Sequence, residues 1–198
     1  APVPAMPERL RIAILASGSG TNAQRLITHF QGRTDAEVVL VGCDDPRAGV
    51  IQRAWDLQVP CYLFSGTQLR DGTVLRELQH LQVGLVLLAG FLRLIPATMV
   101  QAFPKRIINI HPALLPKYGG KGMYGHHVHA AVIAAGESES GITIHYVNER
   151  YDEGEHLFQV KCPVLPNDTP DTLAARVHAL EHEHYPQVVE QLVRAIGR

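Results

Sequence analysis

Short segments that are mostly apolar, without a polar residue at every second position, alternate with segments of helical spacing through the first half of this chain. This alternation restricts the fold more than any other feature. The apolar segments cover residues 10–15, 37–43, 60–64, 84–90 and 106–110, and the helical ones cover 22–30, 49–57 and 68–82. Apolar segments this short favour β-strands over helices. Strands that are apolar on both faces are typical of a parallel sheet covered by helices on each side.

The second half of the chain has a different pattern. Residues 117–127 are rich in glycine and predict a mobile loop, and residues 128–135 predict a short helix. Residues 141–147 alternate, which is typical of a strand, and residues 156–164 follow as its predicted partner. The two faces of the alternating strand carry Ile142, Ile144 and Tyr146 on one side and Thr143, His145 and Val147 on the other.

A long helix completes the predicted fold. It is expected to begin near Thr169, with that residue or Asp168 as its N-terminal cap, and to run to about Arg194. Right-handed crossovers then give a doubly wound α/β fold, with a mostly parallel sheet, helices on both faces and antiparallel additions in the C-terminal half. We expect a single domain over residues 10–198, preceded by a flexible proline-rich arm over residues 1–9.

The composition narrows the class of protein. The formal net charge is -1 and no block of lysine or arginine stands out, whereas a nucleic-acid-binding protein usually carries a basic surface. No apolar run reaches the roughly 18 residues of a membrane span. Three widely spaced cysteines without a Cys-x-x-Cys motif indicate reduced thiols. We therefore expect a soluble cytoplasmic protein that acts on small molecules and binds neither nucleic acid nor membranes.

The segment SGSGTN (17–22) joins the first predicted strand to the first predicted helix. Glycines allow the backbone to approach a phosphate closely, and the N-terminus of a helix adds N–H donors and a partial positive charge. Thr21 and Asn22 would add side-chain donors beside Gly20. These residues predict a phosphate site, although a tight turn alone would also explain them.

The same segment also matches a dinucleotide-binding pattern. Gly18, Gly20 and Ala23 have the required spacing, and Asp44 or Asp45 lies about 20 residues further on, as that pattern asks. The residues therefore do not decide whether the phosphate belongs to a dinucleotide or to a monophosphate.

The segment NIHPALLP (109–116) ends an apolar strand with an amide, a histidine and two prolines. Residues two apart on a strand project from one face, so Asn109 and His111 are predicted to point at one spot. An amide can donate to a developing oxyanion, and a histidine can transfer protons near neutral pH. The pair predicts acyl-transfer chemistry, unless His111 only closes a loop.

Two other groups of polar residues are ambiguous. Asp152 lies in a polar loop, where its carboxylate would raise the pKa of a nearby histidine, but it could equally be a turn aspartate, with Glu149, Glu153 and Glu155 as rivals. The spacings of the pairs His126/His129 and His178/His182 suit metal ligands. No third ligand is identifiable, so no metal is expected. Trp55, the only tryptophan, is expected in the core.

Three segments in this order resemble the 10-formyltetrahydrofolate-dependent formyltransferases. They are LAGFLRLI (88–95), IINIHPALLPKYGG (107–120) and GITIHYVNERYDEGEHLFQ (141–159). The resemblance covers about residues 10–194 and implies a Rossmann-like formyltransferase fold, with 10-formyltetrahydrofolate as co-substrate and no metal. SGSGTN, together with EHEHYP (181–186), narrows it to the members that formylate phosphoribosylglycinamide in de novo purine biosynthesis. A monomer or a homodimer is expected.

The resemblance also implies roles for individual residues. Loop 148–154 would close over the pterin and present Asp152, which would keep His111 charged. Asn109 and protonated His111 would stabilise the tetrahedral intermediate of a direct transfer, without a covalent enzyme intermediate. The implied catalytic residues are Asn109, His111 and Asp152; the implied ribonucleotide-binding residues are Gly20, Thr21, Asn22 and Glu181; the implied folate-binding residues are Leu92, Arg93, Leu94, Ile95 and Asn109.

Several alternatives remain open. Formyltransferases with another acceptor amine, on a sugar nucleotide or methionyl-tRNA, share the catalytic residues, and a formyltetrahydrofolate hydrolase is also related. The tRNA enzyme typically carries a second, basic domain, which 198 residues with a net charge of -1 do not favour. An NAD-dependent dehydrogenase and a non-catalytic binding module are less favoured. The chain has Asp-Glu-Gly-Glu at 152–155, where many members have Asp-Gly-Gly-Pro.

Overall fold

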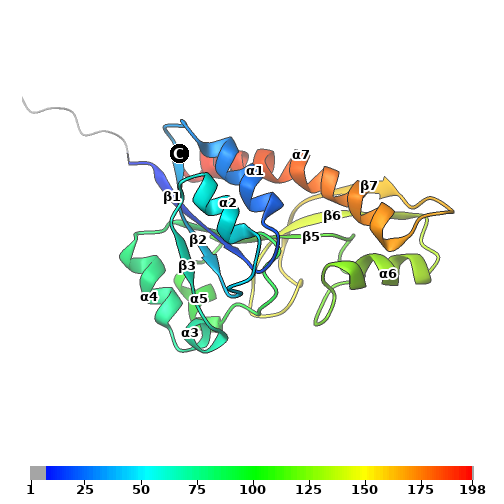
Figure 1. The fold of residues 1–198 in the computed structure, drawn as a ribbon, viewed down its shortest axis with the longest axis horizontal. Helices are drawn as coiled ribbons and strands as arrows, with labels where there is room; N and C mark the ends of the chain where they lie inside the picture. The colour runs from blue at the N-terminus through cyan, green and yellow to red at the C-terminus, as the bar shows by residue number, and fades with distance from the viewer. Residues whose placement is uncertain (1–7, 198) are drawn as a thin grey trace, which may run out of the picture.

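The computed structural model describes residues 8–197, and one seven-stranded sheet runs through them in the order β3-β2-β1-β4-β5-β6-β7 (Figure 1). Strands β1 to β5 are parallel, whereas β6 is antiparallel to β5 and β7 is antiparallel to β6. This confirms the predicted fold class. The strands are β1 Leu10–Ala16, β2 Ala36–Cys43, β3 Cys61–Leu63, β4 Leu85–Leu88, β5 Ile107–His111, β6 Glu139–Tyr146 and β7 His156–Pro163.

Helices cover both faces of the sheet (Figure 1). Residues of α1, α2, α6 and α7 build the core on one face, and residues of α3, α4 and α5 build the core on the other. The helices are α1 Thr21–Phe30, α2 Val50–Asp56, α3 Gly66–Arg70, α4 Thr73–His80, α5 Ala97–Ala102, α6 His126–Ala134 and α7 Pro170–Ile196. Of the arm expected over residues 1–9, residues 1–7 lie outside the part of the chain that the structure describes.

Strand β1 shows why the apolar segments had no alternation. Ile12 and Ile14 point into the core that contains α1 and α7, while Ala13 and Leu15 point into the core that contains α3, α4 and α5. All four side chains are fully buried. A strand in the middle of a two-sided sheet needs apolar residues at every position, as the sequence predicted.

The helix expected over residues 68–82 is in fact two helices. α3 ends at Arg70, and α4 begins at Thr73 after Gly72, whose φ of 91° is in the left-handed region. The Asp71 carboxylate accepts hydrogen bonds from the backbone N–H and the hydroxyl of Thr73, at 2.9 and 2.6 Å. The chain therefore stops one helix and starts another within two residues, because glycine permits the turn and aspartate caps the next N-terminus.

Two expectations about helical residues were wrong or incomplete. Trp55 is 79% exposed, not buried, because α2 turns Val50 and Ala54 to the core instead. Helix α5, which has only six residues, was not predicted. It is too short to show a helical period in the sequence, although Pro96 caps it and Met99 anchors it in the core.

Helix α7 starts as predicted and spans the sheet. Thr169 is its N-terminal cap, and its hydroxyl accepts from the backbone N–H of Thr172 at 3.3 Å. Further along, the fully buried Tyr185 hydroxyl contacts two strands: it lies 2.8 Å from the carbonyl oxygen of Leu88 at the end of β4 and 3.3 Å from that of Ile108 in β5. Helix α7 therefore contacts the end of β4 and the beginning of β5, two neighbouring central strands.

Candidate active site

A cavity of about 590 Å³ opens at the carboxyl ends of the central parallel strands. Between the neighbouring strands β1 and β4 the sheet order reverses direction, which is where open α/β sheets place their ligands. The lining comes from segments far apart in the sequence: 19–22, 88–95, 109–112, 120–125 and 150–152, with His129, His145, Val147, His178 and Glu181.

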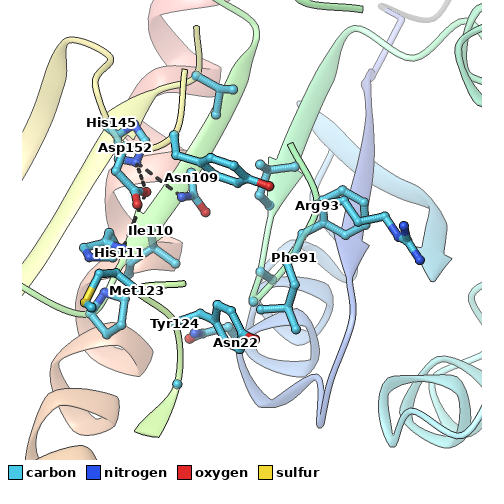
Figure 2. Close-up of a pocket in the computed structure, with 18 of the residues that line it drawn as sticks. Asn22, Phe91, Arg93, Asn109, Ile110, His111, Met123, Tyr124, His145 and Asp152 are labelled. Atoms are coloured by element: carbon cyan, nitrogen blue, oxygen red, sulfur yellow. Dashed lines mark hydrogen bonds and ion pairs between the residues drawn. The ribbon is translucent and has the colours of Figure 1, made fainter. Parts of the chain in front are cut away.

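Four side chains form a polar cluster at one end of this cavity: Asn109, His111, Asp152 and His145 (Figure 2). Asn109 and His111 project from the same face of β5, as their spacing predicted, and Asp152 reaches them from loop 148–154. Asp152 Oδ1 lies 3.5 Å from His111 Nδ1 and 3.6 Å from His145 Nε2. The structure therefore brings together the three residues proposed from the sequence.

His145 is a member of the polar cluster that sequence reasoning did not single out. It stands opposite Asn109 in the β5–β6 pairing, and its Nδ1 donates to the carbonyl oxygen of Tyr146 at 2.9 Å. While the ring is neutral, its Nε2 accepts from the side-chain amide of Asn109 at 3.2 Å; when the ring is protonated, the same nitrogen can donate to Asp152 Oδ1, 3.6 Å away. One hydrogen of the Asn109 amide is thus used within the cluster, and the other remains available to a ligand.

The pKa of His111 is lower than that of a free histidine. Burial is the largest cause, and the charge of Asp152 and the hydrogen bond to Tyr118 act in the opposite direction. The ring is only 3% exposed. Asp152 does favour the charged ring, as expected, but the effect of burial on the pKa is larger.

Asp152 is held in place as a charged group. Burial acts to raise its pKa, but the hydrogen bond with His145, the charge of His111 and the backbone N–H of Gly120 together hold the pKa below its usual value. Gly120 donates to Asp152 Oδ2 at 2.9 Å. Asp152 has a φ of 56°, a left-handed conformation that aspartate tolerates better than most residues.

The opposite end of the cavity is built by the turn before α1. Gly20 has a φ of 78° and precedes the first residue of the helix. A β-carbon on Gly20 would lie 2.4 Å from Cγ2 of Val50, so only glycine fits. Thr21 and Asn22 line the cavity beside it, and the buried side-chain oxygen of Asn22 has no hydrogen-bond partner within residues 8–197. Such an oxygen is a candidate ligand group.

Helix α7 and helix α6 add groups that face the same end. Glu181 is 5% exposed and lines the cavity. His129 of α6 is 1% exposed, and neither of its ring nitrogens finds a partner in the part of the chain that the structure describes. Burial, with the charges of nearby histidines, lowers the pKa of His129 to about 4. The spacing of His129 suited a metal ligand, although no metal was expected, and it gave no sign that the side chain would be buried here.

Glutamine in place of Glu181 is expected to stabilise the protein at pH 8 but not at pH 4. Burial raises the pKa of Glu181 to about 7, from an ordinary 4.5, while a hydrogen bond with Asn22 opposes this. Because the folded state holds this proton more tightly, stability falls as pH rises between these two pKa values. Glu181→Gln does not titrate, so it avoids this decrease in the free energy of unfolding, which is on the order of 3 kcal/mol.

Urea unfolding of both proteins at the two pH values measures this difference. Glu183→Gln is the control, since Glu183 lies on the same helix and its side chain is 64% exposed. A wild-type minus variant difference that is the same at both pH values would contradict a buried, neutral Glu181.

The segment 91–95 forms another wall of the cavity. Leu92 and Leu94 are 45% and 41% exposed, whereas Ile95 is buried in the core behind them. The Arg93 guanidinium points away from the polar cluster (Figure 2) and pairs with Asp44, whose Oδ2 lies 2.7 Å from Arg93 Nε. Asp44, one of the two aspartates that fit the dinucleotide pattern, is therefore already paired with an arginine.

The loop after His111 depends on one buried hydroxyl. Thr143 Oγ1 donates to the carbonyl oxygen of Ala113 at 2.7 Å and accepts from the N–H of Leu115 at 3.1 Å and from Gln159 Nε2 at 3.0 Å. Thr143 is fully buried and lies opposite His111 in the β5–β6 pairing.

Valine in place of Thr143 is expected to lower the free energy of unfolding by about 2 kcal/mol, because buried groups of Ala113 and Leu115 would lose their partner. Thr143→Ser, which keeps the hydroxyl, serves as the control. Chemical denaturation measures both variants, and a valine variant as stable as the serine variant would show that the hydroxyl is not needed.

Residues 8–197 form neither a metal-binding cluster nor a membrane-spanning helix. No group of three or more histidine, cysteine, aspartate or glutamate side chains is arranged there to hold a metal ion. Within the same range, every helix is too short or too polar to cross a membrane.

The parallel sheet, the phosphate-type turn and the polar cluster at one strand end define a group-transfer site, and comparison with known proteins identifies its class. The chain belongs to the formyl transferase family, whose model matches residues 10–189. This confirms the resemblance inferred from the motifs.

Two curated relatives are similar to this chain over most of its length. The chain is 43% identical over 190 residues to the chloroplastic phosphoribosylglycinamide formyltransferase of Arabidopsis thaliana, a match that covers 92% of this chain and 65% of that protein. It is 36% identical over 189 residues to the phosphoribosylglycinamide formyltransferase of Bacillus subtilis (strain 168), covering 92% and 94%. It thus spans just under two thirds of the plant protein and nearly all of the bacterial one.

A solved structure has the same fold as this chain. Glycinamide ribonucleotide transformylase 1 from Symbiobacterium toebii superposes with a TM-score of 0.87 at 32% identity, covering 98% of this chain and 92% of that one.

Proposed function

We propose that this chain transfers a formyl group from 10-formyltetrahydrofolate to the glycinamide amine of N1-(5-phosphoribosyl)glycinamide, a step of de novo purine biosynthesis. One observation carries the proposal: a single cavity has a phosphate-type turn at one end and the polar cluster at the other. A substrate with a phosphate and a nucleophilic amine several bonds apart would use both ends. The names of the relatives support this choice of acceptor.

The polar cluster supplies the chemistry in this proposal. The amine attacks the formyl carbon, forming a carbon–nitrogen bond and a tetrahedral oxyanion. The free N–H of the Asn109 amide donates to that oxyanion, and the protonated ring of His111 stabilises it by its positive charge. The oxyanion beside the ring raises the pKa of His111 and so opposes the effect of burial.

Collapse of the intermediate breaks the bond between the formyl carbon and the folate nitrogen. The proton lost by the attacking amine must reach that nitrogen. Asp152, charged and 3.5 Å from His111, accepts the proton from the amine and passes it to the folate nitrogen as that bond breaks. The transfer returns the carboxylate to its charged form beside the His111 ring.

The other end of the cavity would hold the ribonucleotide. We propose that Gly20, Thr21 and Asn22 bind its phosphate with backbone and side-chain donors, and that Glu181 contacts its ribose. His129 lies at the same end with both ring nitrogens unpaired among residues 8–197, so it would gain a partner when a polar ligand binds.

The folate would lie along segment 91–95 and reach Asn109. Leu92 and Leu94 offer apolar contact, and Ile95 supports them from the core. Since the Arg93 guanidinium is paired with Asp44, we propose that Arg93 contributes mainly through its backbone unless this ion pair opens.

A formyl-transfer assay tests the proposal. Purified protein is mixed with a 10-formyl folate donor and the ribonucleotide, and deformylated folate is followed by absorbance. A parallel reaction omits the ribonucleotide. Signal only with both substrates supports the proposal, signal without the ribonucleotide indicates a hydrolase, and no signal in either indicates another acceptor. Added NADH, with fluorescence as readout, tests the dehydrogenase alternative.

Other expectations from the sequence stay predictions. They are the cytoplasmic location, the monomeric or homodimeric state, the single domain over residues 10–198 and the absence of a metal.

A further inference from the structure

The two ring nitrogens of His111 face different groups. Nε2 lies 2.7 Å from the carbonyl oxygen of Tyr118. A carbonyl oxygen only accepts hydrogen bonds, so Nε2 must carry a hydrogen even when the ring is neutral. Nδ1 is then the unprotonated nitrogen, and it faces Asp152 Oδ1 at 3.5 Å. The Tyr118 carbonyl therefore selects the tautomer and the orientation of His111.

That carbonyl belongs to a short segment, residues 118–120, which contacts both His111 and Asp152. The N–H of Gly120 donates to Asp152 Oδ2 at 2.9 Å. Gly119 packs so closely that a β-carbon there would lie 3.1 Å from Cβ of Asp152. Tyr118 has a φ of 59°, a conformation that costs energy for a bulky residue. Contacts outside the segment must stabilise it.

The side chain of Tyr118 makes such a contact. Its hydroxyl donates to Oε1 of Glu137 at 3.0 Å. Glu137 lies in the turn between α6 and β6, where its backbone N–H donates to the carbonyl oxygen of Val132 at 3.3 Å. Lys117 Nζ approaches the same carboxylate oxygen at 3.3 Å. Hydrogen bonds from Tyr118 and then Lys117 lower the pKa of Glu137, which agrees with a charged acceptor.

We propose that Glu137 is a positioning residue. Through the Tyr118 hydroxyl it holds the carbonyl that keeps the hydrogen of His111 on Nε2 and turns Nδ1 toward Asp152. The effect on turnover rests on the proposed catalytic role of His111, whereas the tautomer is a property of the ring and does not depend on that role.

The tautomer can be followed directly in protein labelled with ¹⁵N-histidine. Long-range proton–nitrogen spectra distinguish protonated from unprotonated ring nitrogens, and the spectrum of His111→Gln identifies the His111 signals. We expect Glu137→Ala to move these signals toward a mixture of both tautomers. Glu137→Gln keeps an oxygen that accepts from Tyr118 and should restore the wild-type pattern. Lys117→Met is the matched control and should leave the signals unchanged, because the Tyr118 contact remains.

Turnover in the formyl-transfer assay gives a second readout. We expect Glu137→Ala to lower kcat about fivefold, with KM values within about twofold of wild type, as for the loss of one positioning hydrogen bond. Unchanged His111 signals in Glu137→Ala would overturn the inference, whether or not kcat falls. A wild-type protein without formyl transfer would remove the proposed function, but the nitrogen signals would still decide the inference about Glu137.

Discussion

Alanine in place of His111 is expected to lower kcat for formyl transfer by about 10²–10⁴-fold, the range for loss of a positioned acid–base group. His111 is buried beside Asp152 at the end of the cavity opposite the phosphate-type turn. The variant should therefore lose the positive charge that stabilises the oxyanion and the partner of Asp152, yet keep the groups that bind the ribonucleotide. Steady-state kinetics measure the first effect, and isothermal titration with the ribonucleotide measures the second.

The control for this prediction is His80→Ala. His80 is exposed at the end of α4 and does not line the cavity, so its loss should leave both kcat and ribonucleotide affinity near wild type. Turnover by His111→Ala close to wild type would refute the proposed role of His111. A large loss of ribonucleotide affinity would instead assign His111 to substrate binding.

Gly154→Ala is expected to reduce kcat about as strongly as His111→Ala does. It would displace the Asp152 carboxylate without changing its chemistry. A β-carbon on Gly154 would lie 1.6 Å from the carbonyl oxygen of Tyr146 and 3.5 Å from His145 Nδ1. Loop 148–154 must therefore move away from β6 and carry Asp152 with it. A shift of about 1 Å in such a group can cost about 10²-fold in rate.

The same substitution should also destabilise the fold by about 1–3 kcal/mol, as overpacking of a buried site does. Gly197→Ala is the matched control, because the nearest atom to a β-carbon there is the Val193 carbonyl oxygen at an ordinary 3.5 Å. Kinetics and thermal unfolding are compared for the two variants. Wild-type turnover by Gly154→Ala would show that the loop does not need its observed path.

Within residues 152–155, the chain departs from the family pattern at Glu153 and Glu155 but keeps the glycine at 154. Glu153 and Glu155 are exposed, while Gly154 between them is buried. The carbonyl oxygen of Glu155 accepts from the N–H of Tyr146 at 2.8 Å, so this residue serves the loop through its backbone. The loop therefore approaches β6 most closely at Gly154, where the chain and the family pattern agree.

The sequence predicted the parts of the site that follow from short-range geometry. The two-residue spacing of Asn109 and His111 placed them on one face of a strand, and the glycines of SGSGTN predicted a turn before a helix. Asp152 was different, because its approach depends on a loop that folds back over β6. Only the family resemblance selected it from the neighbouring glutamates.

The residues that were missed depend on long-range pairing. His145 was assigned to the correct face of its strand, together with Thr143, but its place beside Asn109 depends on the β5–β6 register. The ion pair that turns Arg93 away joins residues 49 positions apart. Trp55 was placed in the core by its residue type, although the packing of its short helix turned it to solvent. None of these outcomes is encoded in a local pattern.

The position of α7 has a consequence for synthesis on the ribosome. Glu181 lines the cavity, and the Tyr185 hydroxyl lies within hydrogen-bond distance of carbonyl oxygens at the end of β4 and near the beginning of β5. Until this helix has left the exit tunnel, the sheet face that carries Ile12 and Ile14 lacks much of its cover. Until α7 emerges, the nascent chain therefore exposes apolar residues of this sheet face, to which a chaperone that shields apolar surface can bind.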